Sequence, residues 1–590
     1  MIRVSDYVAK RLKEFYGVKD VFLIVGGGAM YLNNSFAHYF RCICNHNEQA
    51  SAIAAEGYAR YGQKLAVVNV TTGPGGLNAV GGLLGCWTDS APVLFISGQV
   101  KSSTSMASYP DFPLRQLGDQ EADIISVVKP LVKYCATVRE PNMIKYYLDM
   151  LAHLATNGRF APVWLDIPLD VQSAYIDEKE LEEFYTTKDY PEIYELQIEK
   201  VIDKLKNAKR PLIVVGHGVR LASAKKELMK FLDLYQAPVV TTFNGMDLVL
   251  DTHPSYIGRI GTIGQRAGNF ALQSSDCVLF LGTRNNIRQI SYNWENFAKQ
   301  AFKIIVDIDN IELVKPTIKG DLLVNADAKP FLEDLSKHIK PQIFSEWLSW
   351  CKERKERYSF ENTPEYQHQK EINPYKFTRQ LSEALKPNDV IVTGNASATI
   401  CLFQTAIVKE DQRYIFNSGS AAMGYDLPVA IGASLASKKR TICLTGDGSI
   451  MMNIQELQTI CHHKLPIKIF LLNNGGYISI RQTQDNFFNG EHVGSDLDSG
   501  ISFPDFVKVA EAFNIPAFRI TDPNECQITI EKVLAMDGPV FCEVCTDKNY
   551  IFLPKLSSRT LDDGTIVSPS LEDMYPFLSK AELEQNIIKD

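Results

Sequence analysis

Short apolar runs alternate with helical patterns in three successive segments of the chain. In the first segment, which ends near residue 175, the runs include DVFLIV, LAVVNV, PVLFIS and PVWLDIP. The second, which ends near residue 340, carries RPLIVVGHG, APVVTTF, DCVLFLG and FKIIVDID. The third ends near residue 550 and carries DVIVTG, TICLTGDG, IKIFLLNN and PVFCEV. Apolar strands separated by helices are typical of parallel sheets that are covered by helices.

This alternation predicts an α/β protein with three doubly wound parallel-sheet domains. We place them at residues 1–178, 190–340 and 370–555, and we interpret residues 556–590 as a C-terminal tail because their periodicity is weaker. The polar stretches DEKELEEFYTTKDYPEIYE and CKERKERYSFENTPEYQHQKEI separate the domains. Ligands bind beyond the carboxyl ends of the strands in open parallel sheets. The loops that follow the apolar runs are therefore the places to search for a site.

Composition and charge exclude several classes of partner. The net charge is −8 and no basic run is present, which gives no electrostatic basis for binding nucleic acid. No apolar window approaches the ~20 residues that a membrane span needs. The N-terminal MIRVSDYVAKRLKEFYGVKD is typical of an amphipathic helix with Ser5 as its N-cap, not of a signal peptide. Twelve cysteines in 590 residues are too few for a disulfide scaffold, and we expect a cytoplasmic protein.

Two apolar runs of the third segment end in polar residues that suit a metal ion and a phosphate. The run TICLTG leads into Asp447, and the next run, IKIFLL, leads into Asn474. A strand–helix–strand crossover brings both strand ends to one edge of the sheet, so the two side chains could hold one ion. A carboxylate, an amide oxygen and a backbone carbonyl from the glycine turn are hard ligands that suit Mg²⁺. The glycines and the following helix N-terminus suit a diphosphate.

GDG followed by NN at this separation resembles the cofactor motif of the thiamine diphosphate-dependent enzymes, and more narrowly that of the acetolactate synthase-like carboligases. The resemblance implies thiamine diphosphate and Mg²⁺ as cofactors. It assigns the metal to the side chains of Asp447 and Asn474 and to the carbonyl of Gly476. It also makes the first domain pyrimidine-binding and the third diphosphate-binding. The residues that would bind the cofactor in the third domain are Gly446, Asp447, Gly448, Ser449, Asn474, Gly476 and Tyr477.

Three further stretches carry the resemblance. NHNEQASAIAAEGYAR puts Glu48 at the place of the acid that activates the cofactor, and NSGSAAMGYDLPVAIGA puts Met423 beneath the bent cofactor. TTGPGGLNAVGG is similar to the family's glycine-rich loop. Each piece alone has a plainer interpretation, namely a helix N-terminal acid, a core methionine and an ordinary turn, but the set in family order favours the family. The glycine-rich loop adds Thr72, Gly73, Pro74, Gly75 and Asn78 as cofactor-binding residues.

In that family the thiazolium ring loses its C2 proton, attacks a carbonyl and acts as an electron sink when CO₂ leaves. The resemblance makes Glu48 and Met423 catalytic: Met423 bends the cofactor, and Glu48 is hydrogen-bonded to N1′ of its pyrimidine. If Glu48 lies in an apolar pocket, burial should raise its pKa and ease proton sharing near neutral pH. The family also joins the first domain of one subunit to the third domain of its partner. A homodimer, or a dimer of dimers, with active sites at the interface is therefore implied.

Other positions bear on the reaction. The chain has no histidine between His46 and His153, where decarboxylases of the family carry a His pair, and this favours transfer to a second carbonyl over release of an aldehyde. GDQEADIISVVKPLVKY resembles the acetolactate synthase segment whose glutamine borders the active site, here Gln120. GTRNNIRQ resembles the flavin-contacting stretch, with Arg284 at the flavin and Arg288 at the carboxylate of the acceptor.

The central domain and the acceptor leave alternatives open. With Gly216 and Gly218 in VVGHGVR and Asp307 in VDIDN, this domain either binds FAD or is a vestigial scaffold. Thr483 replaces a tryptophan of acetolactate synthases, which leaves room for a bulkier acceptor. We expect a carboligase that decarboxylates a 2-oxo acid, most simply pyruvate, and transfers the acyl unit to a second carbonyl. Addition of a two-carbon unit to a keto-sugar nucleotide for surface polysaccharide, and a 2-oxo acid decarboxylase or C–C lyase, stay open.

Overall fold

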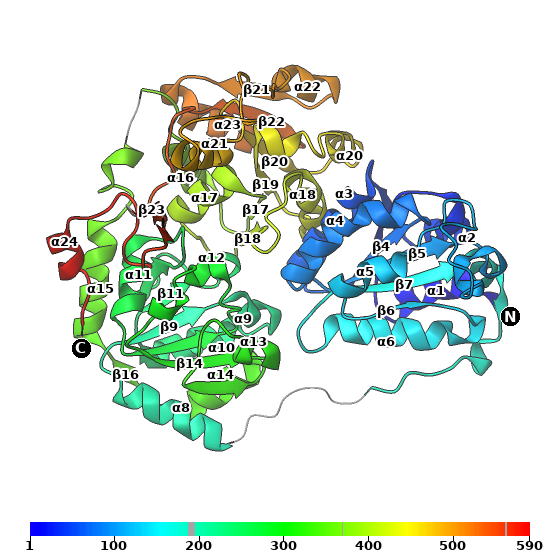
Figure 1. Cartoon of the computed structure of the whole chain (residues 1–590), viewed down its shortest axis with the longest axis horizontal. Helices are drawn as coiled ribbons and strands as arrows, with labels where there is room; N and C mark the ends of the chain where they lie inside the picture. Colours follow the sequence, from blue (N-terminus) through cyan, green and yellow to red (C-terminus); the bar gives the residue numbers. More distant parts are fainter. Residues whose placement is uncertain (187–194, 368–369, 561–562, 564, 590) are drawn as a thin grey trace.

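The computed structural model describes residues 1–186, 195–367, 370–560, 563 and 565–589. Figure 1 shows three lobes: the first domain in blue and cyan at the right, the central domain in green at the lower left, and the third in yellow and orange at the top. The predicted start of the central domain at residue 190 lies outside the described residues, as do residues 561, 562, 564 and 590 of the predicted tail. The exact domain boundaries therefore stay a prediction.

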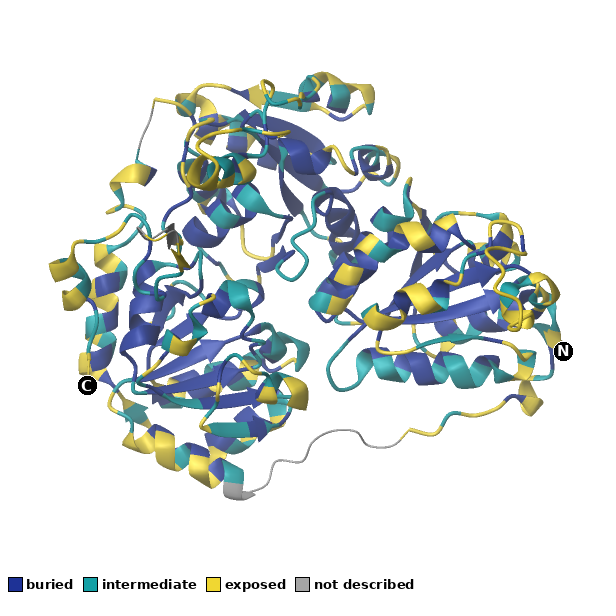
Figure 2. Ribbon diagram, in the orientation of Figure 1, coloured by how far each residue is buried: buried dark blue, intermediate teal, exposed yellow. Residues whose placement is uncertain are grey.

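The first domain is built on a six-stranded parallel sheet with the order β3-β2-β4-β5-β7-β6. Its helices lie on both faces, and the four central strands are buried throughout, whereas the edge strands β3 and β6 are partly exposed (Figure 2). The strands are β2 (Asp20–Leu23), β3 (Arg41–Cys44), β4 (Ala66–Val70), β5 (Val93–Gln99), β6 (Cys135–Thr137) and β7 (Val163–Pro168), and the helices are α1 (Val4–Glu14), α2 (Met30–Tyr39), α3 (Glu48–Gly62), α4 (Pro74–Thr88), α5 (Ile124–Val128), α6 (Ile144–Thr156) and α7 (Leu169–Ser173).

The third domain repeats this topology, with the sheet order β18-β17-β19-β20-β22-β21. In both sheets the strands stand in the order second, first, third, fourth, sixth, fifth. The strands are β17 (Val390–Thr393), β18 (Arg413–Phe416), β19 (Thr441–Gly446), β20 (Ile467–Asn473), β21 (Ala517–Ile520) and β22 (Val540–Cys545), and the helices are α16 (Pro374–Ala384), α17 (Ala396–Thr405), α18 (Asp426–Ser437), α19 (Asp447–Ile450), α20 (Glu456–His462), α21 (Ile478–Phe487), α22 (Phe506–Ala512) and α23 (Cys526–Ala535).

The central sheet has a different order, β12-β11-β9-β13-β14-β15, which is the order third, second, first, fourth, fifth, sixth of dinucleotide-binding folds. The prediction of three parallel-sheet α/β domains, with a Rossmann-like one in the middle, is thus confirmed. The strands are β9 (Pro211–Val215), β11 (Val239–Thr241), β12 (Tyr256–Arg259), β13 (Cys277–Leu281), β14 (Phe302–Asp307) and β15 (Leu322–Asn325), and the helices are α8 (Glu195–Asn207), α9 (His217–Leu221), α10 (Lys225–Leu234), α11 (Arg266–Ser274), α12 (Ile287–Ile290), α13 (Asn310–Val314), α14 (Ala328–His338) and α15 (Ser345–Arg357).

Helix α3 of the first domain packs against helix α18 of the third, and the two domains share one hydrophobic core. Glycines allow the close approach of the two helix backbones. A Cβ atom at Gly57 would lie 2.4 Å from the carbonyl oxygen of Val429, and one at Gly432 would lie 1.8 Å from that of Ala54. Because real Cβ atoms do not come so near a backbone oxygen, only glycine fits at the two contact points.

The tail after the third domain runs along the outer side of the central domain, where Figure 1 draws it in red. Leu571 joins the core of the central domain. From α11, Asn269 donates a hydrogen bond to the carbonyl of Leu571 at 3.1 Å, and Arg266 donates one to that of Met574 at 3.3 Å. The tail ends in helix α24 (Lys580–Gln585). It therefore connects the third domain to the central one by packing as well as by the chain.

One local prediction is wrong. Helix α1 begins at Val4 with Arg3 at the cap position, so Ser5 is not the N-cap. The Ser5 side chain is buried and its hydroxyl accepts a hydrogen bond from Ser35 in α2 at 3.0 Å. A serine before an apolar run is a typical helix cap in sequence. Here its hydrogen-bond partner is Ser35 of the neighbouring helix and not a backbone N–H of α1. In the described part of the chain, the helices are all too short or too polar to cross a bilayer.

Candidate active site

Asp447, Asn474 and Gly476 meet at the carboxyl edge of the third sheet, where strands β19 and β20 lie side by side. Asp447 is only 2% exposed. Its Oδ2 accepts hydrogen bonds from the backbone N–H groups of Asn474 at 3.0 Å and Gly476 at 3.1 Å, and its Oδ1 accepts one from Gly448 at 2.7 Å. The crossover argued from the sequence thus brings the three predicted metal ligands together.

Burial raises the pKa of the Asp447 carboxyl to about 6, and the backbone N–H groups around it oppose that rise. Among the described residues the hydrogen bonds to this carboxylate come from backbone N–H groups, and a divalent ion that neutralises its charge would lower the cost of burying it. The donor set is one carboxylate, one amide and backbone carbonyls, which suits a hard cation that keeps phosphate oxygens among its ligands. These residues therefore fit a Mg²⁺–diphosphate group.

Asp426, which sequence reasoning did not single out, organises the same edge. Its Oδ2 accepts hydrogen bonds from the hydroxyls of Thr445 and Ser449, and the Ser449 hydroxyl in turn accepts one from the N–H of Gly424 at 3.0 Å. The loop that carries Met423 is thereby tied to the glycine turn, and the Met423 side chain is left half-buried. The signal in the sequence was an acid inside the apolar motif GYDLPVAIGA.

In the first domain, the TTGPGG turn after β4 rests on a buried polar network. The Thr72 hydroxyl donates to Oε1 of Gln99 at 2.5 Å, and Nε2 of Gln99 lies 3.4 Å from Asp166. Gly73 has φ +60°, and a Cβ atom there would lie 1.8 Å from the carbonyl oxygen of Gln120. The predicted residues Thr72, Gly73 and Gln120 thus lie together, and they depend on Gln99 and Asp166, which sequence reasoning missed.

Glu48 begins helix α3 behind Asn47, whose side chain caps the helix by accepting the N–H of Gln49 at 2.8 Å. The Glu48 carboxylate accepts a hydrogen bond from Asn78 of α4 at 3.1 Å. Glu48 is half-buried, so the described residues of this chain do not enclose it in the apolar pocket that the sequence led us to expect.

The turn before Glu48 is held by the third domain. The Glu456 carboxylate, at the start of α20, accepts hydrogen bonds from the Asn45 side chain and the His46 N–H, each at 2.8 Å. Asn453 donates to the side chain of Gln49 at 3.2 Å. Three residues separate the GDGS turn from residues 453–456. The Glu48 turn and the segment after Asp447 therefore face each other across the contact between the two domains.

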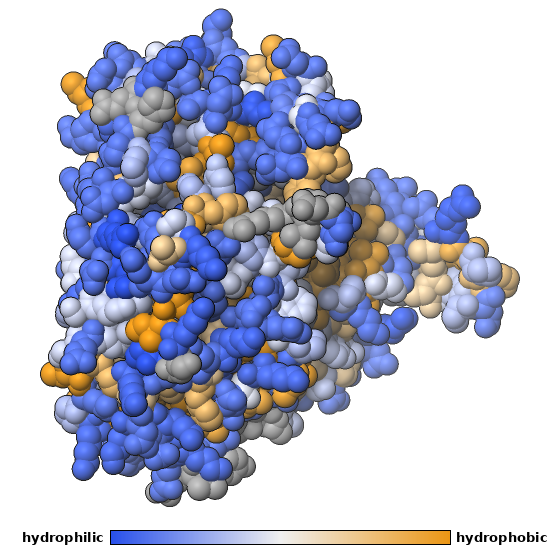
Figure 3. Space-filling view, turned by 60° about the vertical axis from the view of Figure 1, so that its left-hand side comes forward, coloured by the Kyte–Doolittle hydropathy of each residue, from blue (hydrophilic) through white to orange (hydrophobic). Residues whose placement is uncertain are grey.

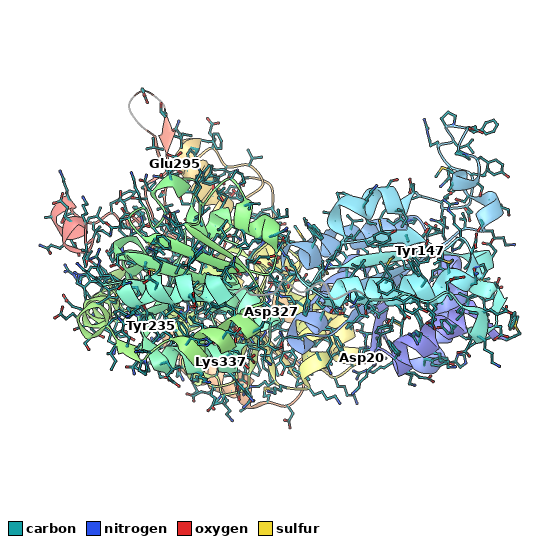
Figure 4. All side chains as sticks on the ribbon, turned by 90° about the horizontal axis from the view of Figure 1, so that it is seen from below. Asp20, Tyr147, Tyr235, Glu295, Asp327 and Lys337 are labelled. Carbon is teal, nitrogen blue, oxygen red and sulfur yellow. The ribbon has the colours of Figure 1, made fainter. Side chains whose placement is uncertain are left out.

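Apart from the Asp447 site, a cavity of about 260 Å³ lies at the carboxyl edge of the central sheet. Gly218, Arg284, Arg288 and Asp307, all predicted from the sequence, line it together with groups of the first domain such as Asp89 and Arg159. Asp327 also lines the cavity, and Figure 4 shows this residue on the side of the central domain that faces the first. A ligand in the cavity would contact both domains.

The chemistry of this cavity suits a nucleotide. Asp307 ends strand β14, and burial raises its pKa to about 6. Gly216 and Gly218 are required by packing, because Cβ atoms there would lie 2.3 Å and 2.7 Å from the backbone of Gly282. Burial lowers the pKa of Arg288, and Asp89 opposes that shift. A carboxylate at a strand end beside a glycine loop is the arrangement that dinucleotide-binding sheets use.

The sequence matches three family models that follow the three sheets. They are the N-terminal TPP binding domain of the thiamine pyrophosphate enzymes at residues 2–125, the central domain at 198–335 and the C-terminal TPP binding domain at 393–544.

The chain is also similar to several acetolactate synthases over most of its length. The chain is 32% identical over 538 residues to the acetolactate synthase isozyme 2 large subunit of Escherichia coli K12, which covers 90% of this chain and 93% of that protein. It is 30% identical over 573 residues to the acetolactate synthase large subunit of Lactococcus lactis, with 95% and 96% covered. It is 30% identical over 578 residues to the chloroplastic acetolactate synthase 1 of Zea mays, with 94% and 87% covered.

Proposed function

The chain belongs to the thiamine pyrophosphate enzymes and is related to the acetolactate synthase large subunits, and from this premise we propose that it is a Mg²⁺-dependent carboligase. It would decarboxylate pyruvate or another small 2-oxo acid and transfer the acyl unit to a second carbonyl. One observation carries the proposal. The buried carboxylate of Asp447 lies at a parallel-sheet edge with Asn474 and Gly476 on its oxygens.

In this proposal Mg²⁺ is held by the side chains of Asp447 and Asn474 and by the carbonyl of Gly476. The glycine turn and Ser449 receive the diphosphate, since the backbone can approach it there. When bound, thiamine diphosphate supplies the electron sink on which a 2-oxo acid loses CO₂. Glu48 would hold the shared proton toward the pyrimidine nitrogen of the bound cofactor, and Asn78 holds the Glu48 carboxylate in position by the hydrogen bond between them. Met423, half-buried on its tied loop, supports the cofactor from the third domain.

We also propose that FAD occupies the cavity of the central domain. Asp307 would accept the hydroxyls of the ribose, and Arg284 would lie at the flavin diphosphate or ring. Arg288 would meet the carboxylate of the acceptor, for which a planar guanidinium offers two parallel hydrogen bonds. The cavity and the place of Asp307 at the end of β14 support this assignment, since a carboxylate there can accept hydrogen bonds from both hydroxyls of a diol. Flavin absorbance in the purified protein tests this part, and Asp307→Ala should remove it.

An apolar stripe on α4 supports a homodimer whose active sites include the interface. Leu77, Leu84 and Trp87 are 43%, 38% and 38% exposed and recur along one face of the helix, with exposed Gly81 between them. Figure 2 shows exposed positions along α4. A contiguous apolar helix face on a soluble domain marks an interaction site. The stripe begins beside Asn78 and Glu48, so a second copy that covers it would also complete the pocket of Glu48.

Thr483 supports a second candidate for the acceptor. It lies on α21 after the asparagine turn, is exposed, and bonds its hydroxyl to the Ser479 carbonyl of its own helix at 3.1 Å. A small side chain there leaves room for an acceptor larger than a 2-oxo acid, such as a keto-sugar nucleotide. A decarboxylase or C–C lyase would differ from both carboligases by releasing free aldehyde.

The experiment that tests the function incubates the protein with Mg²⁺, thiamine diphosphate and isotope-labelled pyruvate, alone and with a panel of keto-sugar nucleotides. Mass spectrometry identifies the product. Labelled acetolactate from pyruvate alone supports the first candidate, and a labelled branched sugar supports the second. Acetaldehyde as the main product, or no turnover of any 2-oxo acid, contradicts the carboligase proposal.

A further inference from the structure

Arg481 touches a candidate metal ligand. It lies in the first turns of α21, which starts directly after the turn that carries Asn474 and Gly476. Its Nη2 donates to the backbone oxygen of Asn474 at 3.1 Å and lies 3.2 Å from Oδ1 of the same residue. The same Nη2 lies 3.3 Å from the carbonyl oxygen of Lys548. A guanidinium, which carries a fixed positive charge, therefore shares the amide oxygen that the Mg²⁺ proposal needs.

A second cation lies over the same turn. A Cβ atom at Gly475 would lie 3.4 Å from Cε and 3.6 Å from Nζ of Lys548. In the described part of the chain, the hydrogen bonds to the Asp447 oxygens come from backbone N–H groups. Asp426, at the same edge, accepts its hydrogen bonds from the hydroxyls of Thr445 and Ser449. Arg481 and Lys548 thus add two positive charges beside the turn that carries the proposed metal ligands. Charges at partly buried positions are screened less than those in open solvent.

A lone divalent cation at this turn would meet that repulsion, since a ligand oxygen that already holds a guanidinium puts the two cations close together. A diphosphate brings two or three negative charges to the same place. It would neutralise the metal together with Arg481, and it would leave the Asn474 oxygen its second lone pair for the metal. The arrangement of charges thus weakens binding of the metal ion by itself and favours binding of the metal ion together with the diphosphate.

We propose that Arg481 makes metal binding conditional on the diphosphate: the site rejects a lone divalent cation and accepts it only together with a diphosphate. This inference rests on the proposed function, because Asn474 is the proposed ligand. Arg481 acts through Asn474 and through charge, and it is a positioning residue that does not touch the substrate. The order of loading follows: metal and cofactor enter as one unit, and metal does not fill the site in advance.

The neighbouring Gln482 offers a matched control. Its Nε2 donates to the carbonyl of Tyr550 at 3.1 Å, and its Oε1 accepts from Lys555 at 3.1 Å. Gln482 therefore anchors the same helix to the same C-terminal segment as Arg481 does, but it carries no charge, and its hydrogen bonds within the described residues go to Tyr550, Phe552 and Lys555 and not to a candidate ligand. A variant at Gln482 reports what loosening α21 does by itself.

The test uses Mn²⁺ as a probe for the metal and follows the free ion by electron paramagnetic resonance. Full-length protein, first dialysed against a chelator and then against metal-free buffer, is titrated with Mn²⁺ alone, with Mn²⁺ and inorganic pyrophosphate, and with Mn²⁺ and thiamine diphosphate. For the unmodified protein we expect Mn²⁺ to bind at least tenfold more tightly with either anion than without. Arg481→Gln keeps hydrogen-bond donors and loses the charge, so it should bind Mn²⁺ alone at least tenfold more tightly than the unmodified protein. Arg481→Lys and Gln482→Ala should retain the dependence on the anion.

Each outcome has one meaning. If the unmodified protein binds Mn²⁺ alone as tightly as with thiamine diphosphate, the inference fails while the proposed function stands. The inference also fails if Arg481→Gln, with an unchanged melting temperature, needs the anion as much as before. If Mn²⁺ does not bind even with thiamine diphosphate, both the proposed function and this inference are contradicted. The comparison within the unmodified protein does not depend on whether any variant folds.

Discussion

At the scale of single residues, two of the acids that the sequence singled out, Glu48 and Asp447, lie in opposite environments. Asp447 is buried, and its carboxylate accepts hydrogen bonds from the backbone N–H groups of Gly448, Asn474 and Gly476. Glu48 is half-buried and accepts one side-chain hydrogen bond. A carboxylate that a metal will neutralise can be buried in advance, because N–H donors stabilise it meanwhile. In the proposed function, Glu48 shares a proton with the cofactor, and its environment would be completed only when the cofactor and a second copy surround it.

Glu48→Gln tests the proton-sharing role. The amide cannot share a proton with the pyrimidine nitrogen, so we expect turnover of pyruvate to fall by about 100-fold or more, with cofactor affinity within a few-fold of the unmodified protein. Steady-state kinetics and calorimetric titration of thiamine diphosphate measure the two quantities. Glu140→Gln, at an exposed acid of the same domain, is the control. Unchanged turnover in the Glu48 variant would remove this residue from the mechanism.

Because Asp166 is buried, we predict that the stability of the fold depends on pH. Burial raises its pKa to about 7, although Ser97, Gln99 and Thr137 donate hydrogen bonds to it. The unfolded chain ionises this group at its ordinary pKa near 3.8, so the folded state loses stability as pH rises from about 4 to about 7. At about 1.4 kcal/mol per pH unit, the loss between pH 5 and pH 7 is roughly 2–3 kcal/mol.

Asp166→Asn should remove this loss, since the amide does not titrate. Urea unfolding at pH 5 and pH 8 measures it, with fluorescence of Trp164 as the local probe because its indole N–H donates to Ser97 at 2.8 Å. Asp111→Asn, at an exposed acid, should keep the pH profile of the unmodified protein. Equal pH profiles for the Asp166 variant and the unmodified protein would show that Asp166 is ionised throughout in the folded state.

At the scale of elements, the contact between α3 and α18 sets how the first and third domains meet. The two helices follow the second strand of their sheets in chain order, so they are equivalent elements of two domains with one topology. Each brings a glycine to the crossing, Gly57 and Gly432, where backbone oxygens of the other helix fill the space. The size of the side chain, and not its hydrophobicity alone, therefore determines which residues can stand at this contact.

Gly57→Ala and Gly62→Ala form a matched pair within α3. At Gly57 the new methyl group would lie 2.4 Å from the Val429 oxygen, whereas at Gly62 its nearest contact is 4.0 Å away. We expect Gly57→Ala to cost about 1–3 kcal/mol or more and Gly62→Ala to be neutral or stabilising by up to about 1 kcal/mol. Thermal unfolding ranks the two. If both variants behave alike, the crossing is looser than these distances require.

At the scale of the whole molecule, the three domains meet at a buried ionic network. Arg60 of α3 donates to Glu56, to the hydroxyl of Tyr425 and to the carbonyl of Phe416, and it also bonds Asp89. Asp89 in turn accepts Asn244 from the central domain at 3.2 Å. Buried charges demand such partners, because leaving one unpaired is strongly destabilising. The network therefore fixes the mutual placement of the domains, and it borders the central cavity through Asp89.

The outer surface differs from this interior. On the side that Figure 3 shows, hydrophilic residues cover most of the surface, and apolar ones gather in the recess beside the part that projects at the right. The apolar stripe of Leu77, Leu84 and Trp87 on α4 is a further apolar surface of the first domain. Its burial by a second copy would lower the free energy by roughly 25 cal/mol for each Å² of apolar area removed from water.

Leu84→Glu tests the role of this stripe. A charge in the centre of an apolar interface should dissociate the dimer at low micromolar concentration and reduce the affinity for thiamine diphosphate, because the pocket of Glu48 then stays open. Sedimentation velocity and cofactor titration measure both effects. Ile528→Glu, at a 69% exposed position on α23, should leave both unchanged. A Leu84 variant with the sedimentation coefficient of the unmodified protein would exclude α4 from the interface.

The sequence by itself determined the α/β class with three parallel sheets, the location of candidate chemistry at strand ends, and the family. These are local properties: strand and helix periodicity, and a turn in which glycine precedes and follows an acid, can be read over a few residues. The tertiary structure decided what depends on packing between distant segments. Asp426 and Gln99 hold residues of the candidate site by hydrogen bonds to Ser449 and Thr72. Ser5 is bonded to Ser35 of another helix, and Arg481 is bonded to Asn474. Contacts of this kind leave no periodic signal, because they follow from how whole domains fill space together.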